Sequence, residues 1–194
     1  MFYLLTVVFV STVTIFLNFI FSGDYQPSVL AELCLVTVIG IVCAFSIDGI
    51  LAFLIRRLPE KWFSPEARIF SVGALERRLY RRSKIGVWKK YVPEWGCFTG
   101  FHKDKMRDSH NSEYIGRFLM ESNYGVAGHL AGALAGFAIV LVPALRPLTV
   151  ALPIAITNAF LSILPTMILR SNTPALRGLY KRNKQRSGPT KSGD

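Results

Sequence analysis

Cysteine is scarce in this sequence, and positive charge is missing from its first quarter. Three cysteines occur in 194 residues, and none forms a Cys-x-x-Cys pair, so a disulfide framework or a zinc site is not expected. The histidines His102 and His110 have no neighbouring carboxylates or cysteines in a metal-binding pattern, so we expect exposed loop positions and no metal. A phosphate-binding glycine loop and a serine-hydrolase elbow are also missing.

What the chain does contain is apolar and basic. It is 51% hydrophobic with a formal net charge of +11 and a mean hydropathy of +0.36, which is too apolar for an ordinary soluble domain. No lysine or arginine precedes Arg56, 15 of the 23 lie between Arg56 and Arg117, and seven more lie from Arg170 to Lys191. Charge that flanks apolar spans favours anionic lipid head groups or an anionic donor as partners, and not nucleic acid.

Long apolar runs predict an all-α, polytopic membrane protein with four transmembrane helices. Each run has about 20 residues or more, enough to cross a bilayer. The first is favoured as a retained helix over a cleaved signal peptide, because no basic residue precedes it and it exceeds a usual signal core. The predicted spans are residues 2–21, 29–55, 124–145 and 148–169.

The basic segments between and after these spans set the predicted topology. In residues 56–123 aromatic residues alternate with Lys and Arg, a pattern typical of amphipathic helices lying at a membrane surface. With four spans, this region and the basic tail 170–194 lie on one side, which the positive-inside rule assigns to the cytoplasm. We therefore expect a cell-membrane protein with both termini cytoplasmic and with loops 22–28 and 144–148 outside.

Three residues are unusual inside the predicted spans. Asp48 is a membrane carboxylate, and such groups are either functional or paired acids near the interface. Pro153 and Pro165 are expected to bend the fourth helix, and neighbouring groups must then satisfy the carbonyls that the prolines free.

The third span carries both a packing pattern and a candidate base. Gly128, Gly132 and Gly136 form a small-xxx-small stripe that predicts close helix packing, within the chain or in a homo-oligomer. Glu121 and His129 are eight residues apart, so they share one side of the helix, roughly 12 Å apart along its axis. They would line one cleft opening to the cytoplasm, with His129 as general base. The alternative is a histidine bonded to a neighbouring helix.

Several short sequences, taken in order, resemble a known family. Trp88-Lys89-Lys90-Tyr91-Val92-Pro93-Glu94 is similar to the Trp-Lys-Asp-x-Leu-Pro-Asp signature of the glycosyl-4,4'-diaponeurosporenoate acyltransferase family. The resemblance covers about residues 70–186, with Lys90 in place of the family's Asp. The other similar pieces are Glu76 and Tyr80, Gly100-Phe101-His102-Lys103, Glu113-Tyr114, Arg117-Phe118, Glu121, His129, Asn172 with Pro174, and Asn183-Lys184-Gln185-Arg186.

The resemblance implies transfer of a fatty acyl group to a hydroxyl of a glycosylated isoprenoid or another membrane lipid, in bacterial carotenoid biosynthesis. The donor would be a thioester such as acyl-CoA, with no bound cofactor. His129 would be the base, Glu121 would orient or polarise, and Asn172 would donate to the oxyanion. Substrate and donor binding falls to Trp88, Lys89, Lys90, Tyr114, Arg117, Asn183 and Arg186.

Two other readings stay open at this point. Small membrane methyltransferases that use S-adenosylmethionine also combine a few helices with a polar cluster of Glu, His, Asn and Arg. A non-enzymatic membrane scaffold, or a subunit of a larger complex, would explain the glycine stripe and the basic face equally well.

Overall fold

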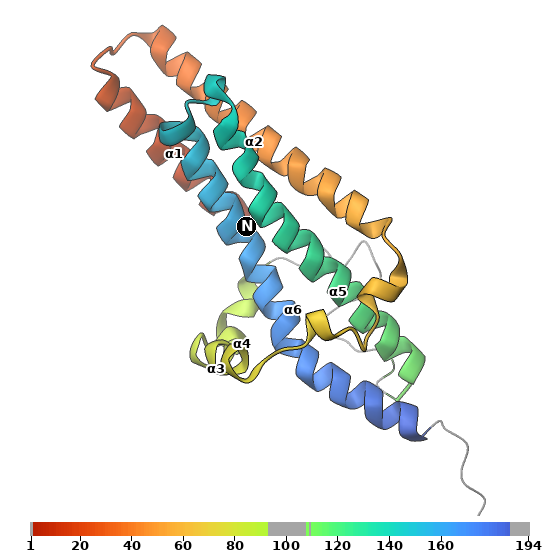
Figure 1. The fold of residues 1–194 in the computed structure, drawn as a ribbon. Coiled ribbons are helices and arrows are strands. Elements are labelled where there is room, and N and C mark those ends of the chain that lie inside the picture. The colour runs from red at the N-terminus through yellow and green to blue at the C-terminus, as the bar shows by residue number, and fades with distance from the viewer. Residues whose placement is uncertain (1, 93–107, 109, 187–194) are drawn as a thin grey trace, which may run out of the picture. The chain divides into compact units, whose positions relative to one another are not determined.

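The computed structural model describes residues 2–92, 108 and 110–186. In these residues every regular element is a helix, which confirms the all-α prediction. Four helical segments are long and apolar enough to span a membrane, as predicted (Figure 1). They are Phe2–Ser22, Pro27–Arg56, Ser112–Leu141 and Leu148–Arg186.

The chain divides into two compact units, each described by itself below. Unit 1 contains Met1–Arg57, Tyr91–Pro93 and Ala127–Thr166, and unit 2 contains Leu58–Lys90, Glu94–Val126 and Met167–Asp194. Two long helices, α5 (Ser112–Ala135) and α6 (Leu152–Arg186), contribute residues to both units.

Unit 1 begins with a helical hairpin of α1 (Phe2–Ser22) and α2 (Pro27–Arg56), red and orange in Figure 1. Gly23 turns the chain between them with a φ of +69°, a conformation that glycine adopts without steric cost. Pro27 opens α2 at the helix start, where its missing N–H is not needed. The unit's buried core is aliphatic and consists of Ala44, Ile139, Leu145, Val150, Ala151, Ile154 and Ala155.

A side chain of α1 replaces the backbone donor that Pro165 removes from α6. Proline has no N–H, so the carbonyl four residues earlier, that of Leu161, loses its helical partner. The Tyr3 hydroxyl donates to that carbonyl at 3.0 Å. Because an unsatisfied carbonyl is costly in a bilayer, this hydrogen bond stabilises the contact. It joins the first helix of the chain to the last.

The same arrangement recurs at Pro153. The carbonyl four residues before it belongs to Thr149, and the Asn18 side-chain amide donates to it at 2.9 Å. The expectation that neighbours satisfy the freed carbonyls is therefore confirmed at both prolines, and α6 is continuous from Leu152 to Arg186.

The two short loops of unit 1 lie at the same end of the unit. Arg146, in the second loop, pairs with Glu32 near the start of α2 at 2.7 Å. Before Arg146, α5 gives way to the 3-10 turns η5 (Gly136–Leu141) and η6 (Pro143–Leu145). Val142, which is extended because it precedes Pro143, separates the two turns.

Both long helices extend beyond their predicted spans. The helix of the third span begins at Ser112 and not at residue 124, since the Asn111 carbonyl oxygen Oδ1 accepts from the backbone N–H groups of Glu113 and Tyr114. The helix of the fourth span continues to Arg186, so residues 170–186 of the predicted tail are helical. The remainder of the tail, residues 187–194, lies outside the described residues.

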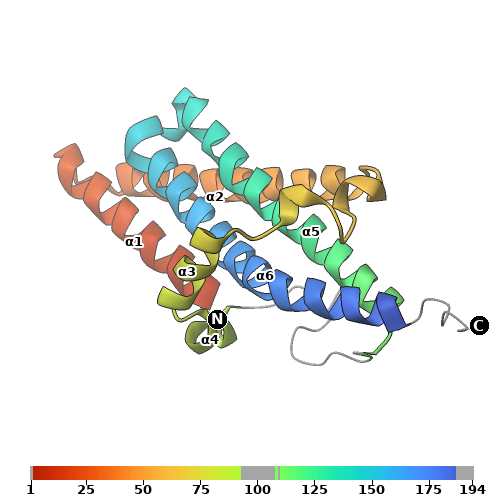
Figure 2. The ribbon, with the colours of Figure 1, turned by 60° about the horizontal axis from the view of Figure 1, so that its bottom comes forward.

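Unit 2 combines the ends of α5 and α6 with short helices from the basic segment. Phe63 stacks on Tyr124 with ring centroids 3.9 Å apart, and Ile115, Leu119 and Leu176 form a buried cluster. The short helices are η1 (Glu60–Phe63), η2 (Arg68–Phe70), α3 (Ala74–Arg82) and α4 (Ile85–Trp88), followed by η3 (Lys89–Tyr91), whose last residue is counted with unit 1. Figure 2 labels α3 and α4.

Candidate functional site

The part of α5 in unit 2 positions three of the predicted site residues. Tyr114, Arg117 and Glu121 follow at spacings of three and four, so they lie along one side of the helix. Arg117 Nε lies 3.7 Å from Glu121 Oε1, and the Glu121 side chain is 13% exposed. Tyr114 packs against the buried cluster of Ile115, Leu119 and Leu176. The structure therefore gives Glu121 a sheltered position beside a cation.

Asn123 was not predicted as a site residue, yet it is one of the most buried polar residues. It is 2% exposed, and its amide donates to the carbonyls of Phe63 at 2.9 Å and Ser64 at 3.2 Å. The neighbouring Tyr124 hydroxyl donates to the Leu58 carbonyl at 2.9 Å. These bonds hold the start of the basic segment against α5.

Three cations of α6 hold the next part of the basic segment. Arg170, Arg177 and Lys184 are spaced by seven residues, which places them along one side of the helix. Arg177 Nη2 donates to the Ala67 carbonyl at 2.6 Å, and Lys184 Nζ bonds to Glu66 at 2.9 Å. Sequence reasoning missed this row, although its heptad spacing is visible in the sequence.

The third cation of this row, Arg170, anchors α3. It bonds Glu76 through Nε and, at 2.8 Å, through Nη2, and it donates to the Ser71 carbonyl at 3.1 Å. Tyr80 donates its hydroxyl to the same carboxylate. The bond from Arg170 lowers the pKa of Glu76, while burial, followed by Glu76, raises the pKa of Tyr80 to about 12. The Glu76 carboxylate thus anchors α3 to Arg170 of α6.

Unit 1 holds His129, on the other half of α5. The ring is half-buried, and it shares this half with the glycine stripe. A Cβ at Gly132 would lie 2.6 Å from Asp48 Oδ1, and a Cβ at Gly136 would lie 2.6 Å from Asn158 Nδ2. The stripe is therefore occupied within the chain by polar side chains of α2 and α6, and a homo-oligomer through this face stays a prediction.

Asp48 is a paired acid of unit 1. Its Oδ1 accepts from the Asn158 amide at 3.2 Å, and the Ser162 side chain also bonds the carboxylate. The three helices α2, α5 and α6 meet here because glycine at position 132 leaves room for the carboxylate.

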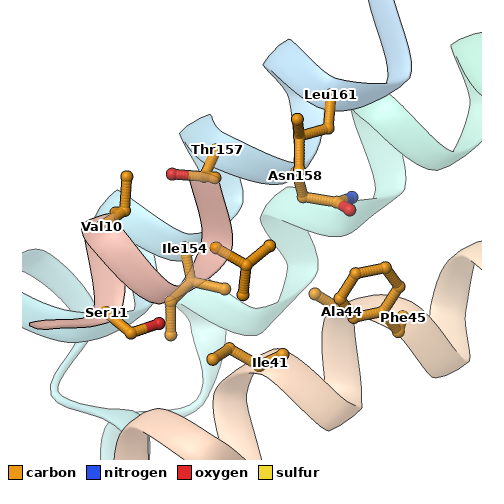
Figure 3. Close-up of a pocket in the computed structure, with 10 residues that line it drawn as sticks. Val10, Ser11, Ile41, Ala44, Phe45, Ile154, Thr157, Asn158 and Leu161 are labelled. Carbon is orange, nitrogen blue, oxygen red and sulfur yellow. The ribbon is translucent and has the colours of Figure 1, made fainter. Parts of the chain in front are cut away.

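A small, partly open pocket lies between α1, α2 and α6 within unit 1 (Figure 3). Its wall is apolar apart from Ser11, Thr157 and Asn158, and no predicted catalytic residue lines it. Lining side chains include Val10, Ile41, Ala44, Phe45, Ile154 and Leu161.

The remaining predicted residues lie in unit 2. The Trp88 ring N–H donates to the Ser83 carbonyl at 2.8 Å and closes the turn between α3 and α4. Asn172 is half-buried and Asn183 is 3% exposed, whereas Arg186 is exposed at the end of α6. Lys89 and Lys90 form η3.

Some predictions concern residues outside the described ranges, and others concern residues that belong to different units. The glycine and aromatic sequence 100–103, with His102, lies outside the described residues. His129 belongs to unit 1 and Glu121 and Asn172 to unit 2, so their mutual placement stays a prediction. Within the described residues no group of three His, Cys, Asp or Glu residues could hold a metal.

Comparison with known proteins identifies the family. The sequence matches the model of the glycosyl-4,4'-diaponeurosporenoate acyltransferase family over residues 59–182. The chain belongs to this family. Membership supports an acyltransferase of carotenoid biosynthesis in general. No curated protein and no solved structure matches the chain.

The extent of the match to this acyltransferase family divides the molecule. It begins after α2 and includes His129, Glu121 and Asn172, together with the unpredicted Asn123 and the anchor Arg170. The hairpin of α1 and α2 precedes the match, and of the predicted binding residues Asn183 and Arg186 lie beyond its end.

Proposed function

We propose that this protein transfers a fatty acyl group from an acyl thioester to a hydroxyl of a glycosylated isoprenoid or another membrane lipid. The family match over residues 59–182 carries the proposal. Four apolar helices support it, because the acceptor dissolves in the bilayer and the acyl chain of the donor is apolar. Acyl-CoA is the proposed donor.

The proposed chemistry is a direct acyl transfer with His129 as the base. The neutral imidazole takes the proton of the acceptor hydroxyl as its oxygen attacks the thioester carbonyl. The C–O bond forms, the C–S bond breaks, and the thiolate leaves with the proton that His129 returns. Asn172 donates to the oxyanion, and Glu121 orients the reacting groups.

Donor binding is assigned to residues of unit 2. Lys89 and Lys90 would bind the phosphates of coenzyme A as point charges, with Arg117, Asn183 and Arg186 as further polar contacts. Trp88 would act indirectly, since its ring N–H already holds the turn from which the two lysines follow. Tyr114 would border the acceptor.

The proposed location is the bacterial cell membrane, with the reaction at the cytoplasmic face. The basic segments 56–123 and 170–194 would lie on that side with both termini, following the positive-inside rule. Anionic lipid head groups would then neutralise part of the +11 charge.

The test is acyl transfer by purified protein in nanodiscs, with labelled acyl-CoA and a glycosylated isoprenoid acceptor. Replacing His129 by Ala should lower kcat by about 10²–10⁴-fold, the usual contribution of a general base. His110→Ala is the matched control, because that histidine is exposed, and it should leave kcat unchanged.

Two outcomes would count against the proposal. Full activity in His129→Ala, at normal expression and thermal stability, removes His129 as the base. Thermal stabilisation of the wild type by S-adenosylmethionine and not by acyl-CoA would replace acyl transfer with methyl transfer, and stabilisation by neither would favour a scaffold.

A further inference from the structure

Helix α3 is held to unit 2 by one side only. Glu76 and Tyr80, one turn apart, bond to each other and to Arg170 of α6. No residue of α3 is buried. This short helix is thus fixed in place by a polar anchor, and its other sides face away from unit 2's core.

One of these free sides is apolar. Leu75 and Leu79 are one turn apart, so they form a ridge along the helix, and they are 80% and 57% exposed. The ridge continues in sequence into α4, where Val87 is 64% exposed. The bond from Trp88 to the Ser83 carbonyl fixes the turn that joins the two helices.

The rest of α3 is cationic. Arg77, Arg78, Arg81 and Arg82 fill the positions that neither the anchor nor the ridge uses, and the one acid, Glu76, is already paired with Arg170. A leucine ridge beside four arginines is amphipathic in the sense of an interfacial helix. A protein partner would need a complementary acidic and apolar surface, whereas an anionic bilayer offers both at once.

We propose that α3 is a docking surface for the anionic bilayer surface, with Leu75 and Leu79 in the acyl region and the four arginines at the lipid phosphates. Two of the four apolar helices that could span a bilayer, α5 and α6, continue along the chain into unit 2. The proposal rests on membrane residence and not on acyl transfer, and it assigns a role to a helix that the proposed chemistry does not use.

The experiment uses full-length protein in nanodiscs, with its three native cysteines replaced by serine. An environment-sensitive fluorophore is attached to Leu75→Cys and, as the matched control, to Arg77→Cys. Two residues along a helix are about 200° apart, so the control position lies on a different side of α3. Quenching by lipids with spin-labelled acyl chains is measured in phosphatidylcholine, with and without phosphatidylglycerol.

The label at position 75 should be quenched by the labelled lipids, and the control label should be quenched weakly. Phosphatidylglycerol should raise quenching at position 75 roughly twofold through the arginines, and about 1 M salt should remove that increase by screening. Adding Arg78→Gln, Arg81→Gln and Arg82→Gln should abolish the dependence on phosphatidylglycerol, with the fold of unit 2 checked by tryptophan fluorescence.

Quenching at position 75 by iodide in water, with none by labelled lipid, would overturn the proposal. Protection from both quenchers would also overturn it, since a second protein copy would then cover the ridge. Either result leaves acyl transfer untouched, because no substrate enters the measurement.

Discussion

Units 1 and 2 both use side chains to satisfy backbone carbonyls outside the regular ladder, but in unit 2 charged donors join the uncharged ones. In unit 1 the donors are uncharged: Asn18 and Tyr3 bond the carbonyls freed by two prolines. In unit 2 the guanidinium groups of Arg170 and Arg177 donate to carbonyls of the basic segment, and the uncharged amide of Asn123 donates to another carbonyl of that segment. This difference in donor charge agrees with the surroundings that the sequence predicts for each unit: the bilayer interior for the spans of unit 1 and the membrane surface for the basic segment of unit 2.

Uncharged donors suit a bilayer because they carry no ionic desolvation cost, whereas charged donors suit an interface where water and lipid phosphates remain near. The carboxyl group of Asp48, well inside α2 of unit 1, is likewise bonded by uncharged groups, an amide and a hydroxyl. Mutations should therefore lower the stability of the two units in different ways. In unit 2 they should act by removing ion pairs, and in unit 1 by disturbing close packing between helices.

The largest effect is expected in unit 2, from Arg170→Gln. The change removes two bonds to Glu76 and one to the Ser71 carbonyl, and it leaves a partly covered carboxylate unpaired. Allowing for side chains that are 17% and 24% exposed, unfolding should become easier by about 2–4 kcal/mol. All three tryptophans lie in the segment 58–126, so tryptophan fluorescence during thermal unfolding reports the loss. The control is Lys184→Gln, which breaks the exposed ion pair with Glu66 on the same side of α6 and should change the free energy of unfolding little.

In unit 1 the sharpest change is Gly132→Ala. The new methyl group would lie 2.6 Å from Asp48 Oδ1 and 2.9 Å from its Cγ, so the helices must shift. Overpacking of this kind costs about 1–3 kcal/mol, measured as a lower midpoint of helix loss by circular dichroism. Gly128→Ala is the control, because its methyl group would meet only Ala52 Cα at 3.9 Å. Equal midpoints for both variants would mean that the stripe does not house Asp48.

A smaller effect is expected where α1 meets the proline-freed carbonyls. Tyr3→Phe removes one hydrogen bond and should cost about 1 kcal/mol. Asn18→Leu removes two, one to the Thr149 carbonyl and one to the Thr14 carbonyl of α1, and should cost about 1–2 kcal/mol. Because both side chains tie α1 to the fourth span, Leu148–Arg186, limited proteolysis of the turn around Gly23 should also become faster. Unchanged stability in the double variant would show that water or lipid satisfies these carbonyls instead.

The smallest effect is a pH dependence confined to unit 2. Arg170 lowers the pKa of Glu76 in the folded state from its ordinary value of 4.5, so the folded state favours the carboxylate. This contribution is complete above that value and is lost as pH falls through the lowered folded pKa. Tryptophan-detected stability should therefore fall on acidification below about pH 4.5, and Glu76→Gln should remove that part of the slope.

Hydropathy predicted the four spans well and the ends of the long helices poorly. The first two helices are almost purely apolar, so their bounds differ from the predicted ones by few residues. The helix of the third span begins at Ser112, where Glu113 and Arg117 make the sequence look like a loop. Hydropathy indicates whether a segment prefers lipid or water. The end of a helix depends instead on capping groups and packing contacts, which hydropathy does not report.

The family was predictable from the sequence, whereas the site residues stay a prediction and their contacts could not be foreseen. His129 and Glu121 followed from spacing on one helix, and the family followed from ordered short motifs. The row of Arg170, Arg177 and Lys184 looked like a basic tail, because sequence alone does not show that each cation meets an oxygen of the basic segment. Nothing in the sequence around Asn123 predicted that its side chain would be buried and bonded to the basic segment.

The bonds from Tyr3 and Asn18 to the fourth span also bear on how the chain is made. Synthesis delivers α1 to the membrane first and α6 last, so Tyr3 and Asn18 enter the lipid before the carbonyls of Leu161 and Thr149 are available, although Asn18 can already bond the Thr14 carbonyl of its own helix. The first helix would complete its packing only when the last one arrives. A ribosome-bound intermediate that stops before residue 149 should therefore hold α1 more loosely than the finished protein does.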